Sequence, residues 1–330
     1  MSLPAQTLQA WRADLANGRT TSREMTERAL EAIGQSSEGA ATFIAVHGAS
    51  ARATADAIDS LHAAQVPLPP LAGIPISVKD LFDQAGQVTR AGSRVLEDAA
   101  PAAQDSAVVQ RLRAAGAVIV GRTNMTEFAY SGLGLNPHYG TPRNPWDRAT
   151  GRIPGGSSSG AAISVTDGMA APAIGTDTGG SVRIPAALCG LTGFKPTARR
   201  VSTAGALPLS TTLDSIGPLA HSVACCALLD AVLSGEPLAA SGPATLAGRC
   251  LALPRTVVLD GMDEAVAQAF EAACRTLSAA GVRLVEMEMP EFAELAHINR
   301  LGGFNAAEAW AWHAPLLQMG EARYDRRVAG

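Results

Sequence analysis

The feature that most constrains this chain is the stretch from Gly155 to Pro196, which reads GGSSSGAAISVTDGMAAPAIGTDTGGSVRIPAALCGLTGFKP. It contains two clusters of glycine beside serine, GGSSSG at 155–160 and TGGS at 178–181. Glycine permits positive φ and close approach of the backbone, so each cluster can turn its N–H groups toward a small bound group. Between them lie a helix-length segment and then AAPAIGTD, an apolar run that predicts a buried strand ending at Asp177. Two such clusters predict one site, with a serine at the end of each turn.

Two common glycine-loop motifs fit this stretch poorly. A phosphate-binding P-loop has Lys and then Ser or Thr after its second glycine, whereas Gly160 is followed by Ala161. The string 156–160 matches G-x-S-x-G with Ser158 as nucleophile. That elbow follows a strand, and the preceding NPWDRATGRIP carries prolines that disfavour one. Neither a P-loop nor a nucleophile elbow is therefore expected.

A Ser-His-Asp triad is also weakly supported. Three histidines follow the serines in the chain, His221, His297 and His313, and none of them lies in a motif that marks a catalytic base. A histidine without such a motif is more often a packing or surface residue.

The basic residues indicate a different kind of base. Of the 26 lysines and arginines, only Lys79 and Lys195 are lysine. Arginine keeps its proton in proteins, whereas a desolvated lysine loses it readily, so a site that needs a neutral amine must use lysine. Lys79 ends the apolar run IPISV, and burial of that strand would favour the neutral amine; a surface lysine at a strand end is the alternative. Lys195 precedes Pro196, which imposes an extended backbone, and is interpreted as structural.

These residues resemble the amidase signature family, whose members hydrolyse carboxylic amides with a Ser-Ser-Lys triad. Three pieces match in order and spacing: PLAGIPISVKD around Lys79, GGSSSG around Ser157, and GTDTGGSVRIPAALCGLTGFKPT around Ser181. The resemblance extends through AGAVIVGRTNMTEF and NPHYGTPRNPWD, and is strong over residues 71–219. Ser159 departs from the pattern, because the family usually has glycine there.

The resemblance implies a role for each matching residue. Ser181 resembles the nucleophile, Ser157 the bridging serine that follows a cis peptide, and Lys79 the base. Further positions form two sets: an oxyanion hole at Thr178, Gly179, Gly180 and Ser181, and a substrate-facing segment at Ala129, Tyr130 and Ser131. From the residues alone, Tyr130 fits a core position equally well. The mechanism implied needs neither a metal nor an organic cofactor.

The pattern of elements predicts the fold class. From Leu71 onward, strands and helices alternate, which favours an α/β fold with a mixed, largely parallel central sheet covered by helices on both faces. We expect one amidase domain over residues 1–330. Its expected parts are a helical N-terminal segment (1–65), a catalytic core (71–219), a linker or insertion (235–248) and a C-terminal part (249–330).

Several local signals predict individual helices. TSRE predicts a capping box in which Thr21 caps a helix and Glu24 bonds back. Asp105 is expected to cap the helix that begins at SAVVQRLRAAG. The segment 262–280 has helical periodicity, followed by alternation in a strand at Val285 and Met287. The helix residues expected to face inward are Val266, Phe270, Ala273 and Leu277.

Composition and charge argue against several classes of partner. The net charge is −4 with no basic stripe, so no nucleic-acid partner is expected. No run is apolar and long enough to span a membrane, and the N-terminus lacks the apolar core of a signal peptide. The five cysteines are odd in number and lack C-x-x-C spacing, which favours a cytoplasmic protein without a zinc site.

The end of the chain is a point of departure from the family. Members are usually longer, with a further helix and closing strands that have no counterpart after RYDRRVAG. An uncovered sheet edge or helix layer would associate or destabilise the chain, so oligomers or a low melting temperature are expected. The resemblance also implies that the N-terminal region packs on the main domain or forms a homodimer contact.

The sequence therefore predicts an amidohydrolase that cleaves a small-molecule carboxylic amide to an acid plus ammonia or amine, through an acyl-enzyme on Ser181. Two alternatives stay open. The chain could be the glutaminase (A) subunit of an aminoacyl-tRNA amidotransferase, which passes ammonia to a partner subunit, or a non-catalytic binding or scaffold protein. The residues do not specify the acyl group.

Overall fold

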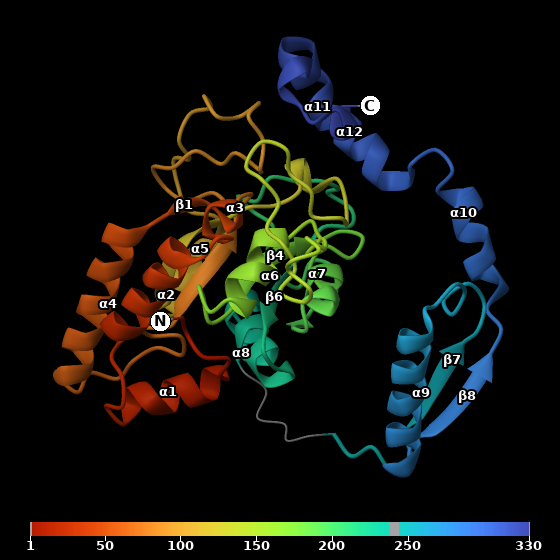
Figure 1. The fold of residues 1–330 in the computed structure, drawn as a ribbon, viewed down its shortest axis with the longest axis horizontal. Helices are drawn as coiled ribbons and strands as arrows, with labels where there is room; N and C mark the ends of the chain where they lie inside the picture. The colour runs from red at the N-terminus through yellow and green to blue at the C-terminus, as the bar shows by residue number, and fades with distance from the viewer. Residues whose placement is uncertain (1, 238–243, 330) are drawn as a thin grey trace. The chain divides into compact units, whose positions relative to one another are not determined.

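The structure is a computed structural model that describes residues 2–237 and 244–329 (Figure 1). It divides into two compact units. The first comprises Met1–Leu238 together with Glu308–Gly330, and the second comprises Ala239–Ala307. The linker predicted at 235–248 falls partly on residues 238–243, which lie outside the described residues.

The first unit is built on a mixed sheet. Among the described residues this sheet has six strands, in the order β1-β3-β2-β4-β6-β5. The pairs β3–β2 and β2–β4 are parallel, whereas β1, β6 and β5 each pair with their neighbour in antiparallel fashion. Four strands, β3, β2, β4 and β5, therefore share one direction, and the predicted mixed, largely parallel sheet is confirmed. The strands are β1 (Phe43–Val46), β2 (Pro75–Lys79), β3 (Val118–Thr123), β4 (Ala173–Asp177), β5 (Thr192–Gly193) and β6 (Ser215–Ala220).

Four of these strands are buried along their whole length, which explains their continuous apolar runs. Every residue of β2, β3, β4 and β6 is buried. A strand covered on both faces cannot alternate apolar and polar residues, because no face meets water. A polar group in these strands is therefore costly to bury unless it is hydrogen-bonded inside the protein.

The N-terminal helices form as the capping signals predict. Thr7 caps α1 (Leu8–Ala16), and Thr21 and Glu24 form the complete capping box of α2 (Ser22–Gln35). Figure 1 shows α2 beside α4 (Gly48–Ala63), and ion pairs of Arg52 with Glu27 and of Arg23 with Asp56 join the two helices.

Among the remaining helices of the first unit, one predicted cap is wrong. Ser106, not Asp105, caps α5, because the Ser106 hydroxyl accepts the Val109 N–H, while the Asp105 carboxylate accepts the N–H of Ala85 in another loop. The helices are α3 (Gly39–Thr42), α5 (Ala107–Ala114), η1 (Glu127–Ala129), α6 (Ser159–Thr166), α7 (Arg183–Leu188), α8 (Val223–Ser234), α11 (Gly303–Gly320, which belongs to this unit from Glu308 onward), η3 (Glu321–Arg323) and α12 (Arg326–Ala329).

The second unit is a small strand-helix-strand element. Strands β7 (Cys250–Pro254) and β8 (Arg283–Met287) pair in parallel, with α9 (Glu264–Ala279) between them in the chain. The short helices η2 (Pro290–Glu294) and α10 (Leu295–Ile298) follow.

The prediction that one face of α9 points into a core is wrong. None of its residues is buried, and Val266 and Phe270 are 54% and 38% exposed. In β8, Val285 and Met287 are likewise exposed. A pair of strands offers too little surface to bury an amphipathic helix, so the periodicity marks an apolar face without placing it in a core.

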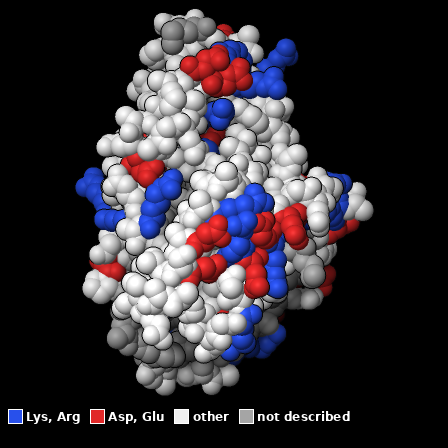
Figure 2. Space-filling view, turned by 90° about the vertical axis from the view of Figure 1, so that its left-hand side faces the viewer, with Lys and Arg blue, Asp and Glu red and all other residues white. Residues whose placement is uncertain are grey.

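Surface charge and helix length relate to the expectation of neither a nucleic-acid nor a membrane partner. On the face that Figure 2 shows, Lys and Arg side chains lie beside Asp and Glu side chains. Within the described residues, none of the helices combines the length and the apolar character needed to cross a bilayer.

Candidate active site

The TGGS turn follows directly from the end of β4, where Asp177 organises it. The buried Asp177 carboxylate accepts the N–H groups of Gly180 (2.8 Å) and Val182 (3.1 Å), and it pairs with the Arg183 guanidinium at 2.8 Å. Burial opposes ionisation, but Arg183 and the N–H donors outweigh it and hold the pKa of Asp177 below its usual value. Gly180 has φ +131°, a conformation that side chains disfavour, so glycine is required here.

Lys79 is the last residue of β2, and its side chain is completely buried. Its ammonium nitrogen donates to Ser157 Oγ at 2.7 Å and to Thr176 Oγ1 at 2.8 Å. Burial lowers the pKa of Lys79 from its usual 10.5 to about 7, although the negative charges of Asp214 and Asp177 act in the opposite direction. The prediction that strand burial favours the neutral amine is confirmed, and the surface-lysine alternative is wrong.

The GGSSSG turn brings Ser157 to this lysine. The peptide between Gly156 and Ser157 is cis, as the family resemblance implied. The Ser157 carbonyl accepts the Thr126 N–H at 3.1 Å, and the Ser158 N–H donates to the Ser181 carbonyl at 3.2 Å. The two glycine clusters are therefore neighbours, as the sequence predicted.

Hydrogen bonds do not link all three predicted catalytic residues. Lys79 and Ser157 share a hydrogen bond, whereas Ser181 Oγ bonds to neither of them among the described residues. Ser158, the candidate of the rejected elbow motif, is buried and donates to the Thr176 carbonyl at 3.4 Å.

The predicted oxyanion donors fall into two groups. The Gly180 N–H is already bonded to Asp177, whereas the N–H groups of Thr178, Gly179 and Ser181 make no hydrogen bond to any described residue. An oxyanion hole needs donors that are free to turn to the substrate. Thr178, Gly179 and Ser181 therefore fit that role better than Gly180.

The predicted substrate-facing segment, residues 129–131, lies beside the turn that contains Ser157. The carbonyl of Gly132, the next residue after this segment, accepts the Gly156 N–H at 2.7 Å. Ala129 is buried with φ +61°, and Tyr130 is exposed, so Tyr130 is not a core residue. The Ser131 hydroxyl accepts the Leu133 N–H at 3.1 Å.

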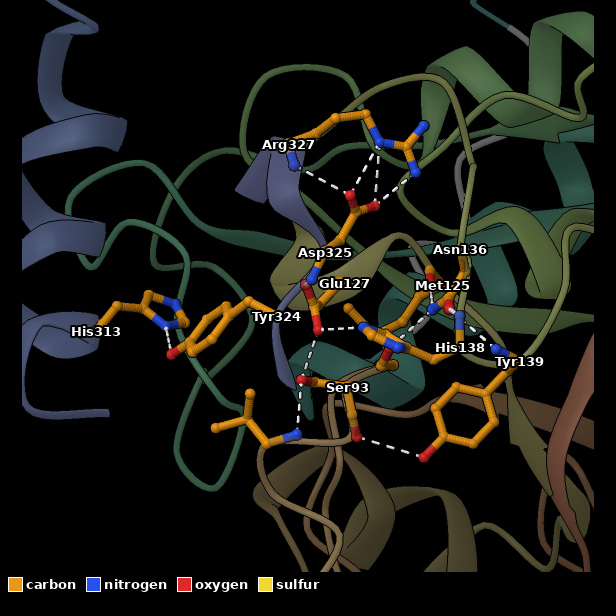
Figure 3. Close-up of polar contacts among 12 residues, drawn as sticks. Ser93, Met125, Glu127, Asn136, His138, Tyr139, His313, Tyr324, Asp325 and Arg327 are labelled. Atoms are coloured by element: carbon orange, nitrogen blue, oxygen red, sulfur yellow. Dashed lines mark hydrogen bonds and ion pairs between the residues drawn. The ribbon is translucent and has the colours of Figure 1, made fainter. Parts of the chain in front are cut away.

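A buried carboxylate that the sequence reading missed fixes this segment (Figure 3). Glu127 accepts hydrogen bonds from Ser93 Oγ (2.6 Å) and from the Asp325 N–H (2.7 Å), and it contacts His138 Nε2 at 2.8 Å. The side-chain oxygen of Asn136 accepts the backbone N–H of His138. Four separated stretches of chain therefore meet at the turn that precedes Tyr130. The signal available was Glu127 itself, the one charged residue of the run TNMTEFAY.

The second missed residue is Thr176. It lies on β4 opposite the end of β2, where its hydroxyl accepts the second hydrogen bond from Lys79. A polar residue inside a fully buried strand could have pointed to it.

The histidines lie elsewhere. His313 Nδ1 is 3.0 Å from the Tyr324 hydroxyl, and burial lowers the pKa of His313 to about 4. Burial also lowers the pKa of His221. Within residues 2–237 and 244–329, no histidine is hydrogen-bonded to Ser157, Ser158 or Ser181.

Comparison with known proteins finds relatives over most of the chain. The protein is 42% identical over 80% of its length to 2-amino-5-chloromuconic acid deaminase of Comamonas testosteroni, and covers 58% of that protein. It is 40% identical over 86% of its length to the A subunit of glutamyl-tRNA(Gln) amidotransferase from Synechococcus sp. (strain WH7803), and covers 60% of it. It thus spans about three-fifths of the length of these curated relatives.

A solved structure and a family model cover most of the chain. The crystal structure of an amidase matches with a TM-score of 0.89 and 34% identity, over 98% of this chain and 72% of that one. The family model described as Amidase matches residues 24–310. The chain therefore belongs to the amidase signature family.

Proposed function

We propose that the protein is an amidohydrolase that cleaves a carboxylic amide through an acyl-enzyme on Ser181. The observation that carries this proposal is the fully buried Lys79, whose pKa is lowered to about 7 and whose amine lies 2.7 Å from Ser157 Oγ. A lysine that keeps a neutral fraction at physiological pH can act as a general base. The family membership and the relatives that act on C–N bonds support the same reaction class.

In the proposed acylation step, Ser181 Oγ attacks the amide carbonyl carbon, and the carbonyl π electrons move to its oxygen. The Ser181 proton passes to Ser157 Oγ while the Ser157 proton passes to the neutral amine of Lys79. Before this transfer the Ser157 O–H donates to the neutral amine across the 2.7 Å contact, and after it the Lys79 ammonium donates back to Ser157 Oγ. Thr176 holds the amine from its other side.

The developing oxyanion needs donors, and the N–H groups of Thr178, Gly179 and Ser181 are the free ones in this turn. Loss of one such donor raises a barrier by about 3 to 4 kcal/mol. Collapse of the intermediate breaks the C–N bond, and the leaving nitrogen takes a proton from Ser157, which is resupplied by Lys79. Water then attacks the acyl group and releases the acid by the same relay in reverse.

The substrate is proposed to be a small-molecule amide, with the segment from Ala129 to Ser131 at its binding site and the cytoplasm as its compartment. A glutaminase role is the second candidate, because the A subunit of glutamyl-tRNA(Gln) amidotransferase is among the relatives.

Ammonia release from a panel of aliphatic, aromatic and dicarboxylic amides, with glutamine included, tests the proposal. Each assay is run with the chain alone and with the remaining subunits of an amidotransferase, beside a Ser181→Ala variant as the blank. Turnover of a simple amide by the chain alone supports the amidohydrolase. Turnover of glutamine only with partner subunits supports the second candidate, and release that equals the blank throughout contradicts both.

A further inference from the structure

The loop 209–214, which follows β5 and precedes β6, is anchored by one carboxylate from helix α11. Glu308 on α11 accepts hydrogen bonds from Ser210 Oγ (2.6 Å), the Thr212 N–H (3.1 Å), the Thr211 hydroxyl (3.3 Å) and the Thr212 hydroxyl. The hydrogen bonds from Ser210 and Thr212 lower the pKa of Glu308 to about 2, so the carboxylate is ionised at neutral pH. Hydrogen bonds to an ionised acceptor are stronger than neutral ones.

The inner side of the same loop reaches the TGGS turn. Asp214 accepts the N–H groups of Leu209 (2.9 Å) and Ser210 (3.2 Å), and it also accepts the Thr178 hydroxyl. Ser210 therefore links two carboxylates, since its hydroxyl donates to Glu308 and its N–H donates to Asp214. A continuous chain of hydrogen bonds leads from α11 to the first residue of the oxyanion turn.

The two carboxylates that hold the turn differ in their support. Asp177 is part of a buried strand of the central sheet, so its position is set by the sheet ladder. Asp214 lies in a loop. Among the described residues, Glu308 is the side chain from outside this loop that accepts hydrogen bonds from residues 210–212. Asp177 occupies the N–H of Gly180, whereas Asp214 bonds Thr178, whose own N–H is free.

We propose that Glu308 is a positioning residue: it fixes the loop 209–214, and through Asp214 and the Thr178 hydroxyl it aims the free N–H groups of Thr178 and Gly179 at the acyl oxygen. The inference rests on the proposed amide hydrolysis. Oxyanion donors act on charge that develops in the transition state, so loss of their alignment lowers kcat and leaves substrate binding nearly intact.

The test compares Glu308→Ala, Glu308→Gln, Thr178→Val and the double variant Glu308→Ala/Thr178→Val in steady-state kinetics. We expect kcat to fall about tenfold to a hundredfold in Glu308→Ala, with KM within about twofold. Glu308→Gln keeps an acceptor oxygen and should lose less. Because Glu308 acts through Thr178, the double variant should be no slower than the slower single variant. Glu321→Ala, in the same C-terminal segment, is the matched control and should equal the wild type.

Hydrogen exchange measured by mass spectrometry gives a readout that does not need turnover. In Glu308→Ala, peptides covering residues 209–214 and the Gly180 amide, which is hydrogen-bonded to Asp177, should exchange faster, while those from β2 and β3 stay unchanged. Full kcat in Glu308→Ala, losses that multiply in the double variant, or faster exchange confined to α11 would overturn the inference. If the wild type hydrolyses no amide, the proposed function fails, and the exchange experiment still decides whether Glu308 holds the turn.

Discussion

The strands of both compact units carry apolar residues, but those residues are buried in the first unit and largely exposed in the second. In the first unit, β2 and β4 are buried at every position, and the polar groups of Lys79, Thr176 and Asp177 are each hydrogen-bonded. In the second unit, β7 and β8 are mostly exposed, and Glu286 of β8 pairs with Arg255 at the surface. Burial therefore makes the polar residues of the first unit chemically distinctive, since desolvation changes their pKa values and requires a partner for each.

The largest expected effect concerns Lys79, the most deeply buried basic group of the proposed site. Lys79→Arg keeps the positive charge but removes the possibility of deprotonation, so kcat should fall about a hundredfold to ten-thousandfold, as it should in Lys79→Ala. In the wild type, activity should rise with pH through about 7, because the amine loses its proton there. Initial rates from pH 5.5 to 9 measure both effects. An arginine variant with half the wild-type kcat would exclude the proposed base.

The buried Lys79 should also make the free energy of unfolding depend on pH. Its pKa is about 7 in the folded state against its usual 10.5, so between these values the unfolded state binds a proton that the folded state lacks. Stability of the wild type should therefore rise with pH across this window by about 1.4 kcal/mol per pH unit relative to Lys79→Met. Urea unfolding of both proteins at pH 7, 8 and 9 measures the difference. Parallel stability curves would show that the lysine keeps its proton when folded.

A matched pair of isoleucines sharpens the comparison of the units. Ile76 in β2 is fully buried, whereas Ile298 in α10 is 61% exposed. Ile76→Ala should destabilise the first unit by about 2 to 5 kcal/mol, and Ile298→Ala should change stability by no more than about 0.5 kcal/mol. Urea unfolding followed by hydrogen exchange in peptides of each unit separates the two effects. Equal losses would mean that α10 is covered in solution.

The contrast also explains what the sequence could predict. The continuous apolar runs predicted β2 and β4, and the glycine clusters predicted two neighbouring turns, because both signals are local and depend on backbone conformation. The burial of α9 was predicted wrongly, since periodicity identifies an apolar face but does not supply the surface that covers it. Thr176 and Glu308 were missed because their roles depend on contacts between segments distant in sequence.

The central claim is that Ser181 forms a covalent intermediate with help from the buried lysine. Incubation with a fluorophosphonate probe, followed by peptide mapping in a mass spectrometer, tests it most directly. The account predicts one labelled residue, Ser181, with labelling abolished in Ser181→Ala and strongly slowed in Lys79→Arg. Label on Ser158, or no label on any serine of a folded protein, would contradict it.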